Sequence, residues 1–337
     1  MYKEKSPAST LLKLSIACVA ICSSQTVKSQ SVDYSVMAVP EERSLNLVQI
    51  TRESDFVCMP QVMRNANGVD WYTNRILGVT PDGRSVAYLS SRNNSTNIFI
   101  KSIDRQGASR QRTNRSSVLD FTISPDGKEI CFSELKGETS QVFLTDAADG
   151  YVCRQITTAN RDYSPIFNSN KDKIFFTRAE NRGYSIWAYD MKNNFLSAYA
   201  PGLGASPAAD GMSVYVSRIS QDNRGEIWKI NYTTGEEVCL LSDPERSFHT
   251  PQVSPDGRKL VLTGSSKIET GAGNGYWNTD IYTIDVDGTD LTQLTYHACD
   301  DLSPVWSADG KHIYFISQRG DANAVANIWR MDNISIK

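Results

Sequence analysis

The chain has 337 residues, of which 40% are hydrophobic and 22% are charged, and its formal net charge is −3. This composition is that of a globular protein long enough to form one large repeat domain. It excludes a strongly basic protein, and no cluster of Lys and Arg indicates nucleic acid as a partner.

Residues 1–30 predict export to the periplasm or secretion. Two lysines precede the apolar run LLKLSIACVAICSS, which has signal-peptide length and is too short to span a bilayer comfortably. Lys13 interrupts the run, so a cytoplasmic N-terminus is the alternative. Cys18 and Cys22 raise the option of a lipoprotein, although the residues before them fit a bacterial lipid-attachment box poorly. No other segment is apolar enough for a transmembrane span. Residues 31–44 are interpreted as a polar connector.

A repeated turn organises residues 45–335. Each copy follows a short apolar segment and precedes an apolar-rich strand, and the copies stand at Asp82-Gly83, Asp126-Gly127, Asn170-Lys171, Asp210-Gly211, Asp256-Gly257 and Asp309-Gly310. Successive turns are 44, 44, 40, 46 and 53 residues apart, a period typical of propeller blades. Glycine accepts the positive φ that closes such a turn.

A third strand recurs with the same period. It alternates apolar and polar residues around a central aromatic side chain and appears at 97–104, 140–146, 184–190, 226–231, 280–285 and 327–332. The repeats predict an all-β fold, a six-bladed β-propeller of four-stranded antiparallel blades. The tryptophans in repeat positions are expected to pack between blades, and they are Trp187, Trp228, Trp306 and Trp329.

The first and last segments of the repeat region predict how the ring closes. A fourth strand is seen in CRQIT (153–157) and LTQLT (291–295), but the last blade has none after NIWRMD. The segment LVQIT (47–51) matches these fourth strands and precedes the first full blade. We therefore expect residues 45–51 to pair beside 327–332, which covers an otherwise exposed strand edge.

The cysteines indicate neither a disulfide scaffold nor a metal site. Five follow the export segment, an odd number without CxxC spacing. Cys131 and Cys239 stand at strand positions and are expected to be small core residues. No cofactor is predicted.

Two insertions suggest where a functional surface lies. Residues 52–75 separate the closing strand from the first blade, and residues 264–280 join the second and third strands of the fifth blade. Both are interpreted as long irregular segments. In a propeller these two kinds of connection emerge on one face and the Asp-Gly turns on the other, and loops on a rigid scaffold usually carry function.

Ten residues are candidates for a binding site on that face or at the channel mouth. The insertions contribute Trp71, Tyr72, Tyr276 and Trp277, and the loops entering the first strands contribute Asp120, Arg161, Asp162, His249, Asp300 and Asp301. Aromatic rings beside carboxylates suit a sugar, a peptide or a basic loop. The alternative is structural: each tryptophan anchors its own loop, and the aspartates cap backbone amides. The run GAGNG (271–275) lacks the GxGxxG spacing and is interpreted as a flexible loop.

The repeats SPVWSADGKHIYF and TDIYTIDVDGTDLTQLT resemble the WD40-like repeats of the TolB propeller family over about residues 45–332. The resemblance implies a six-bladed propeller at the bacterial cell envelope that works by protein–protein contact. TolB proteins also carry an N-terminal α/β domain, and here only a few tens of residues precede the closing strand. Similar repeats occur in prolyl oligopeptidase-type peptidases, whose hydrolase domain with its GxSxG motif has no counterpart here.

Enzymatic alternatives have weaker support in the residues. The chain has three histidines, and none shows HxH or HExxH spacing. Oligogalacturonate lyases with similar repeats use a histidine-rich manganese site, for which His249 is one candidate here. Propeller glycosidases need paired carboxylates, which Asp162 with Asp300 or Asp301 would supply. The sequence therefore favours a monomeric, non-catalytic protein- or peptide-binding module. A carbohydrate-active glycosidase or lyase, or a structural part of an envelope complex, stays open.

Overall fold

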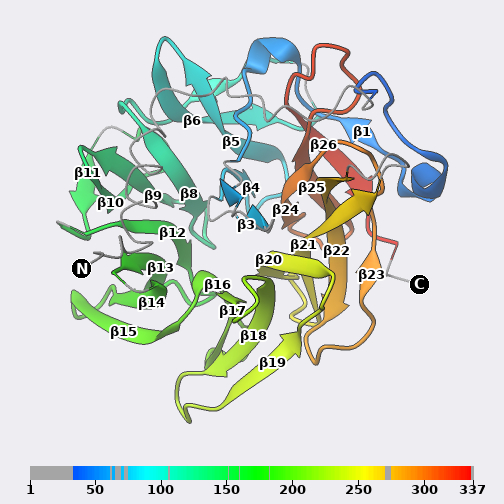
Figure 1. Cartoon of the computed structure of the whole chain (residues 1–337). Coiled ribbons are helices and arrows are strands. Elements are labelled where there is room, and N and C mark those ends of the chain that lie inside the picture. The colour runs from blue at the N-terminus through cyan, green and yellow to red at the C-terminus, as the bar shows by residue number, and fades with distance from the viewer. Residues whose placement is uncertain are drawn as a thin grey trace, which may run out of the picture.

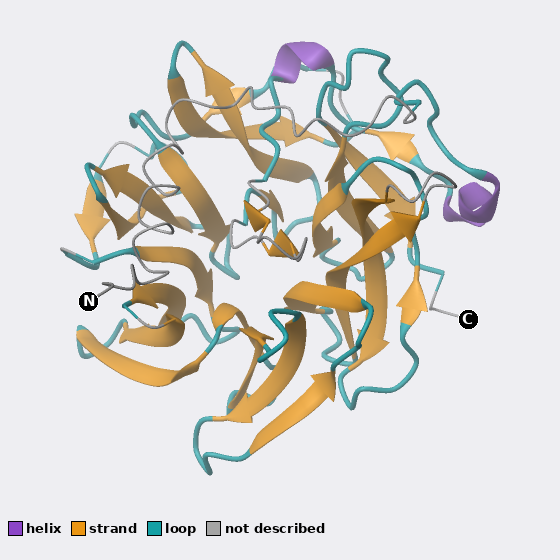
Figure 2. Cartoon of the chain, viewed as in Figure 1, coloured by secondary structure: helices purple, strands orange, loops and turns teal. Residues whose placement is uncertain are grey.

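Six four-stranded antiparallel sheets form a ring in the computed structural model (Figure 1). Strands dominate the described residues, and the helices among them are short 3-10 turns (Figure 2). In each blade the first strand lies nearest the centre of the ring and the fourth lies at its rim. The structure describes residues 33–60, 63–64, 70–71, 75–104, 107–150, 152–158, 160–181, 183–269 and 275–334.

The first and second strands form the inner half of each blade. The first strands are β4 (Leu77–Val79), β8 (Val118–Ile123), β12 (Asp162–Phe167), β16 (Leu203–Pro207), β20 (Arg246–Val253) and β24 (Asp301–Trp306). The second strands are β5 (Ser85–Arg92), β9 (Glu129–Lys136), β13 (Lys173–Glu180), β17 (Ser213–Ile219), β21 (Lys259–Glu269) and β25 (His312–Ser317). Each second strand is largely buried because it packs against blades on both sides.

The third and fourth strands form the outer half. The third strands are β6 (Ser95–Ser102), β10 (Thr139–Asp146), β14 (Gly183–Asp190), β18 (Gly225–Asn231), β22 (Gly275–Asp285) and β26 (Asn327–Asp332), close to the predicted ranges. The fourth strands are β7 (Arg110–Gln111), β11 (Cys153–Gln155), β15 (Phe195–Pro201), β19 (Glu237–Leu241), β23 (Thr292–Gln293) and β1 (Val48–Gln49). The prediction of six four-stranded blades is confirmed.

The ring closes as the sequence predicts. Strand β1 pairs antiparallel with β26, with Gln49 opposite Trp329. The Thr51 hydroxyl accepts a hydrogen bond from the backbone N–H of Ile328 at 2.8 Å, as Thr157 does from Val142 within the second blade. The Gln-x-Thr pattern of the fourth strands therefore fixes the closing strand in the same way as an internal one.

Apolar residues fill the spaces between neighbouring blades. Trp187 packs in the cluster shared by the second and third blades and Trp228 in that of the third and fourth, while Trp306 and Trp329 pack where the fifth and sixth meet. Inter-blade packing by these four residues is confirmed. Cys131 is buried as expected, but the prediction for Cys239 is wrong, because its side chain is exposed on the edge strand β19.

The repeated turns form one face of the ring, called here the turn face. A Cβ added at Gly127 would lie 3.5 Å from the Pro81 ring of the preceding blade, and one added at Gly257 would lie 2.7 Å from Ala209. The Lys171 ammonium reaches Asp126 at 2.8 Å in the same way. Neighbouring turns therefore touch, and the glycines, at φ +67° to +74° in the five Asp-Gly copies, close them without strain.

The opposite face, called here the loop face, carries the connections between blades and the hairpins joining second to third strands. The N–H of Thr96 at one such hairpin donates to Ser116 in a connection at 3.4 Å, and Ser140 donates to Asn160 at 3.1 Å. The described residues of both insertions lie at this end of the blades, since the N–H of Cys58 donates to the carbonyl of Leu89 near the end of β5, and β21 and β22 stay paired as far as Glu269 and Gly275. The prediction that 264–280 is irregular is wrong for most of it, because 264–269 and 275–280 continue the hairpin of β21 and β22, while 270–274 lie outside the described residues.

The segment before the closing strand packs on the ring. Residues Pro40–Leu45 form the 3-10 helix η2, and Glu42 and Leu45 within it are buried. Glu53–Asp55 form a second short helix, η3. Within the described residues, no helix has the length and apolar character needed to cross a membrane.

Candidate functional site

The described strands of the first insertion lie near the centre of the ring. Its strands β2 (Met63–Arg64) and β3 (Asp70–Trp71) form a two-stranded hairpin, and β3 contacts β20 of the fifth blade and lies near the centre of Figure 1. The buried Arg75 guanidinium donates to the carbonyls of Gly204, at 3.2 Å, and Ala205, in the first strand of the fourth blade. Arg75 thus braces two blades on opposite sides of the ring.

Asp120 lies in β8 and is fully buried. Its carboxylate accepts from the Ser133 hydroxyl and, at 2.9 Å, from the backbone N–H of Ser164 in the next blade. Ser164 has φ 52° at a register shift of β12, and that bulge turns its N–H toward Asp120. Burial raises the pKa of Asp120 to about 6, although these hydrogen bonds oppose the rise. The side chain therefore caps a backbone amide between blades.

Arg161 and Asp162 follow each other but serve different partners. Asp162 is buried and binds Arg178 through two hydrogen bonds of 2.7 and 3.0 Å. The Arg178 guanidinium carbon lies 4.1 Å from the centre of the Trp187 ring. Arg161 is half-buried and donates to the carbonyl of Glu138 at 3.3 Å. Both residues stabilise the third blade and its neighbour.

His249 is buried between the fourth and fifth blades. Its Nε2 lies 2.8 Å from the Ser247 hydroxyl. A Cβ added at Gly225 would lie 2.0 Å from its Cε1, so the imidazole packs directly on the third strand of the fourth blade. The Ser247 hydroxyl also accepts from the N–H of Gly225 at 2.6 Å. This serine–histidine pair is sealed inside the scaffold.

Asp300 and Asp301 belong to a buried acidic cluster where the fifth and sixth blades meet. Arg319 binds Glu42 at 2.8 Å and also binds Asp301, and all three side chains are inaccessible to solvent. Burial raises the pKa of Asp301 to about 6 against the opposing charge of Arg319. Asp300 accepts from the N–H of Thr279 at 3.0 Å. The arginine is therefore the cation that holds this cluster together.

Asp280 is the fourth carboxyl group of the cluster. It accepts from the side-chain amides of Asn278 at 3.1 Å and Gln293 at 3.2 Å. Burial, together with the nearby charge of Asp301, raises its pKa well above the ordinary value. Asp280 therefore stands in a buried site where carboxyl groups crowd around Arg319.

Tyr276 and Trp277 lie on the extended hairpin, opposite Ile268 and Lys267 on β21. Both rings are half-buried. Burial and the charges of Asp280 and Asp300 raise the pKa of Tyr276, so this tyrosine lies beside the acidic cluster. Trp71 belongs to β3, and its side chain is outside the described part, as is all of Tyr72.

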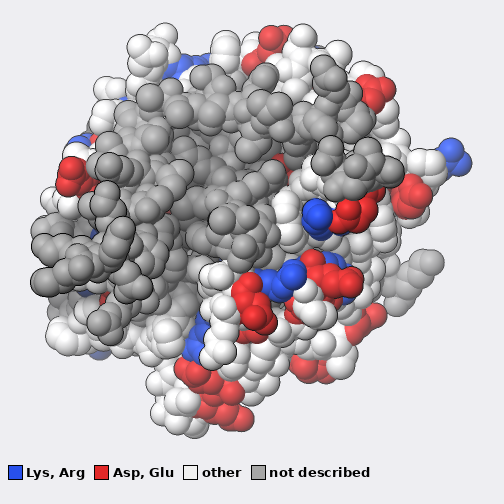
Figure 3. All heavy atoms as spheres, in the orientation of Figure 1, with Lys and Arg blue, Asp and Glu red and all other residues white. Residues whose placement is uncertain are grey.

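The structure thus brings together three of the predicted residues, Tyr276, Asp300 and Asp301, and distributes Asp120, Asp162 and His249 among other blade junctions. Among the described residues, no group of three or more His, Cys, Asp or Glu side chains is arranged to hold a metal ion. On the face seen in Figure 3, charges of both signs lie next to one another over the described part.

The role of Arg319 was missed, yet the sequence holds a signal for it. An arginine lies in or just after the second strand in four blades: Arg178 and Arg218 lie within β13 and β17, Arg92 ends β5, and Arg319 follows β25. Each stacks on an aromatic ring of its own blade, with the guanidinium carbon 4.1 to 5.3 Å from the ring centre. A cation–π contact therefore recurs in these blades, although from different positions along the strand.

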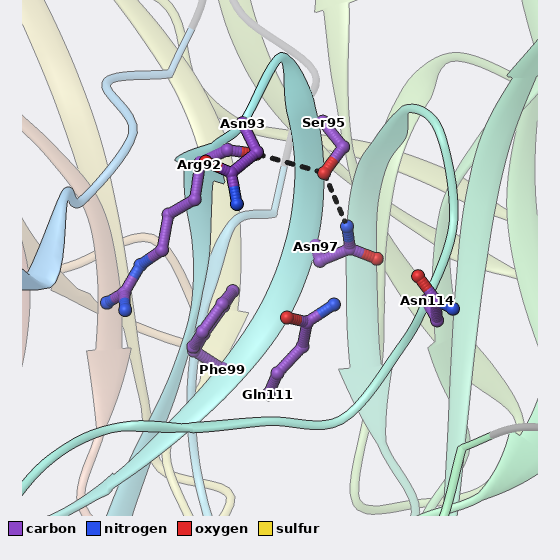
Figure 4. A pocket seen from close by; sticks show the side chains of 7 residues that line it. All are labelled: Arg92, Asn93, Ser95, Asn97, Phe99, Gln111 and Asn114. Atoms are coloured by element: carbon purple, nitrogen blue, oxygen red, sulfur yellow. Dashed lines mark hydrogen bonds between the residues drawn. The ribbon is translucent and has the colours of Figure 1, made fainter.

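A groove that sequence reasoning also missed lies on the outer half of the first blade, at its loop-face end. Its volume is about 320 Å³, and it is lined by Arg92, Ser95, Asn97, Phe99, Gln111 and Asn114, with Asn93 at its edge (Figure 4). These residues follow no motif, because most are polar residues of a hairpin turn and a connection.

Two known proteins are similar to part of this chain in sequence. No family model matches the chain. The tricorn protease of Thermoplasma acidophilum is 21% identical over 194 residues, 56% of this chain and 18% of the protease. The uncharacterized peptidase YuxL of Bacillus subtilis is 25% identical over 195 residues, 55% of this chain and 28% of YuxL. The matches therefore span less than a third of these curated relatives.

Solved structures match over more of the chain. A putative TolB of Agrobacterium tumefaciens superposes with a TM-score of 0.58 at 15% identity, covering 78% of this chain and 93% of that one. The chain has the propeller fold of TolB. An oligogalacturonate lyase of Vibrio parahaemolyticus superposes with a TM-score of 0.55 at 12% identity, covering 88% of this chain and 96% of the lyase. The same ring thus occurs in TolB and in a lyase.

Proposed function

We propose that this chain is an exported, non-catalytic propeller of the bacterial cell envelope that binds a protein or peptide on its loop face, on the surface carrying 52–75 and 264–280. The proposal depends on the exposure of Trp277 on the hairpin of β21 and β22. Its ring is half-exposed and its indole N–H donates no hydrogen bond within the described part of the chain. The indoles of Trp187, Trp228 and Trp306 donate to Ser185, Glu226 and Gln252, and that of Trp329, which also lacks a partner among the described residues, is fully buried between blades. A half-exposed tryptophan on a rigid hairpin is a typical interface anchor.

The state of the carboxylates supports binding over catalysis. Glycoside hydrolysis needs two carboxyl groups that flank a bound substrate. Asp120, Asp162 and Asp301 are buried, and each is engaged with a serine or arginine of the scaffold. Their hydrogen bonds hold blades together, which leaves them poorly placed to exchange protons with a ligand.

Similarity to TolB supports the same conclusion at the level of the fold. A propeller presents its loop face as a surface for another molecule. The signal-like residues 1–30 support periplasmic location or secretion, and the proposed partner is a protein or peptide of the envelope bound by a monomeric propeller.

Affinity capture from envelope extract, quantified by mass spectrometry, tests the proposal. Replacing Trp71 and Trp277 with alanine should lower the captured partner at least tenfold and leave the melting temperature nearly unchanged. Arg258→Ala, on the exposed part of the turn face, is the matched control and should capture as the wild type does. The proposal loses its basis if the wild type, the Trp71→Ala/Trp277→Ala double variant and Arg258→Ala all capture equal amounts of partner. It also loses its basis if the melting temperature of the double variant falls sharply.

A carbohydrate-active propeller is the second candidate, favoured by the fold shared with the oligogalacturonate lyase and by the proximity of Asp280, Asp300 and Asp301. Incubation with oligogalacturonate, with and without Mn²⁺, distinguishes it from a binding module. Unsaturated products that disappear in Asp301→Asn would establish the lyase. Their absence under both conditions is expected of the binding module.

A further inference from the structure

The groove on the first blade has a rigid floor. The Asn97 side chain is 2% exposed and makes four hydrogen bonds: its amide donates to Ser95 at 3.2 Å and to the carbonyl of Arg115 at 3.0 Å, and its oxygen accepts from Thr113 and the Arg115 N–H. The Ser95 hydroxyl donates to the carbonyl of Arg92 at 3.0 Å. A floor fixed in this way loses little conformational freedom when a ligand binds.

The wall of the groove carries uncommitted polar groups. Asn93 and Asn114 are exposed, and their side chains make no hydrogen bond within the part of the chain that the structure describes. The Gln111 amide nitrogen donates to the carbonyl of Thr113 at 2.6 Å, while its oxygen accepts nothing from described residues. Arg92 donates through Nε to Ser90 and through Nη2 to the carbonyl of Asp55, each at 3.0 Å, which leaves Nη1 facing away from those partners.

Comparison with other blades shows why the groove is open here. In the second blade Gln155 donates to Gln141 on the third strand at 2.9 Å, and in the fifth Gln293 donates to Asp280 at 3.2 Å. Gln111 is the counterpart of both glutamines, but Asn97 is committed to residues 113–115 instead. Gln111 and Asn97 therefore form no hydrogen bond with each other in the first blade, unlike the equivalent pairs in the second and fifth blades.

The groove chemistry favours one class of ligand. Amides that both donate and accept match neighbouring hydroxyl groups, and the volume of about 320 Å³ lies at the lower end of the range of about 300–1,000 Å³ for small-molecule sites. A peptide would need a free strand edge or an apolar pocket. The backbone of β6 at Thr96 and Ile98 is already hydrogen-bonded to Arg112, Thr113 and Ser116. The Arg92 guanidinium covers Phe99, with its carbon 4.3 Å from the ring centre. A phosphate would need several cationic or backbone N–H donors.

We propose that this groove binds a single sugar unit. Asn114, Asn93 and Gln111 form hydrogen bonds with its hydroxyl groups, and Arg92 donates to the ring oxygen or to one hydroxyl oxygen of the sugar. The site belongs to the outer strands of the first blade, away from the channel mouth and the extended hairpin, and it borders residues 52–75 through the Arg92 hydrogen bond to the Asp55 carbonyl. It is an accessory site that would attach the propeller to a glycan of its surroundings, and it stands or falls independently of the loop-face partner.

Saturation-transfer NMR on the full chain tests the proposal, with glucose, galactose and N-acetylglucosamine as sugar probes and trialanine as the peptide probe. At least one sugar should give saturation transfer, and the double variant Gln111→Ala/Asn114→Ala should weaken its binding at least tenfold. Gln155→Ala, the same residue type at the equivalent position of the second blade, is the matched control and should bind as the wild type does.

Melting curves keep the result interpretable, because all the substituted side chains are exposed and the variants should melt with the wild type. The proposal is overturned if none of the three sugars gives saturation transfer, if trialanine binds and the sugars do not, or if the double variant binds sugar as tightly as Gln155→Ala. None of these outcomes depends on Trp71 or Trp277, so they are distinct from failure of the loop-face proposal.

Discussion

The two faces of the ring treat the same residue, aspartate, in opposite ways. On the turn face Asp82, Asp256 and Asp309 accept hydrogen bonds from a Ser or Thr hydroxyl of their own turn and from a backbone N–H, and these bonds lower their pKa values. Toward the loop face, burial raises the pKa values of Asp120, Asp280 and Asp301.

This difference shows that the aspartate contacts are uniform on the turn face and vary from blade to blade on the loop face. A turn aspartate needs only its own local sequence, so the same Asp-Gly pattern recurs in five of the six blades. A loop-face aspartate needs a partner supplied by another element: Ser164 for Asp120, Arg178 for Asp162 and Arg319 for Asp301. The loop face therefore differs from blade to blade, as expected of the side that acquires function.

The largest effect is expected from Arg319→Met, which leaves Asp301 and Glu42 buried without their cation. Breaking a buried ion pair from one side costs about 3–5 kcal/mol of unfolding free energy. Urea denaturation measures the loss. Arg258→Met on the exposed turn face should change the free energy by less than about 0.5 kcal/mol. Equal effects of the two substitutions would remove the contrast between the faces.

Asp120→Asn sharpens the contrast through pH. The folded-state pKa of Asp120 is about 6, above the ordinary value of 3.8, so the folded protein holds an extra proton between these values and loses stability as pH rises through them. This shift corresponds to up to about 3 kcal/mol. The variant should lose correspondingly less stability than the wild type between pH 4 and 7 in urea denaturation. Parallel pH profiles would show that Asp120 does not titrate there.

A glycine pair on the turn face separates backbone strain from contact between blades. Gly211 and Gly257 have φ +67° and +74°, but only a Cβ at Gly257 meets a neighbour, Ala209, at 2.7 Å. Gly211→Ala should cost about 1–2 kcal/mol from the left-handed backbone alone. Gly257→Ala should cost clearly more in the same thermal unfolding experiment, because the adjacent turn has to move. A smaller cost at Gly257 would mean that the turns are not packed against each other.

The smallest effect is expected from Asp256→Asn. The lowered pKa of Asp256 arises first from its hydrogen bond with Ser254, and its contribution is therefore present above pH 3.8 and lost as pH falls through the lower folded-state pKa. Because the residue is exposed, the effect should stay below about 1 kcal/mol. In acid unfolding monitored by circular dichroism, the small difference between wild type and variant should be present above pH 4 and shrink as pH falls below it, the opposite window to that of Asp120.

The repeat itself could be predicted because each blade spells it out locally. The Asp-Gly turns, the third strands and the match of LVQIT to the other fourth strands predicted six blades and their closure, and Gln49 does pair with Trp329. The sequence singled out Asp162 and Asp301 but not their partners, because Arg178 and Arg319 reach them through side-chain geometry that spacing does not encode. The first-blade groove depends on which neighbours Asn97 bonds, which a single sequence cannot tell.

Site-specific photo-crosslinking on the two faces tests the central claim most directly. A photoreactive amino acid is placed either at Lys267, exposed on the loop-face hairpin, or at Arg258, exposed on the turn face. We expect one defined adduct with an envelope protein from position 267 and none from position 258. Adducts from position 258 alone, or the same adducts from both positions, would contradict a binding surface on the loop face.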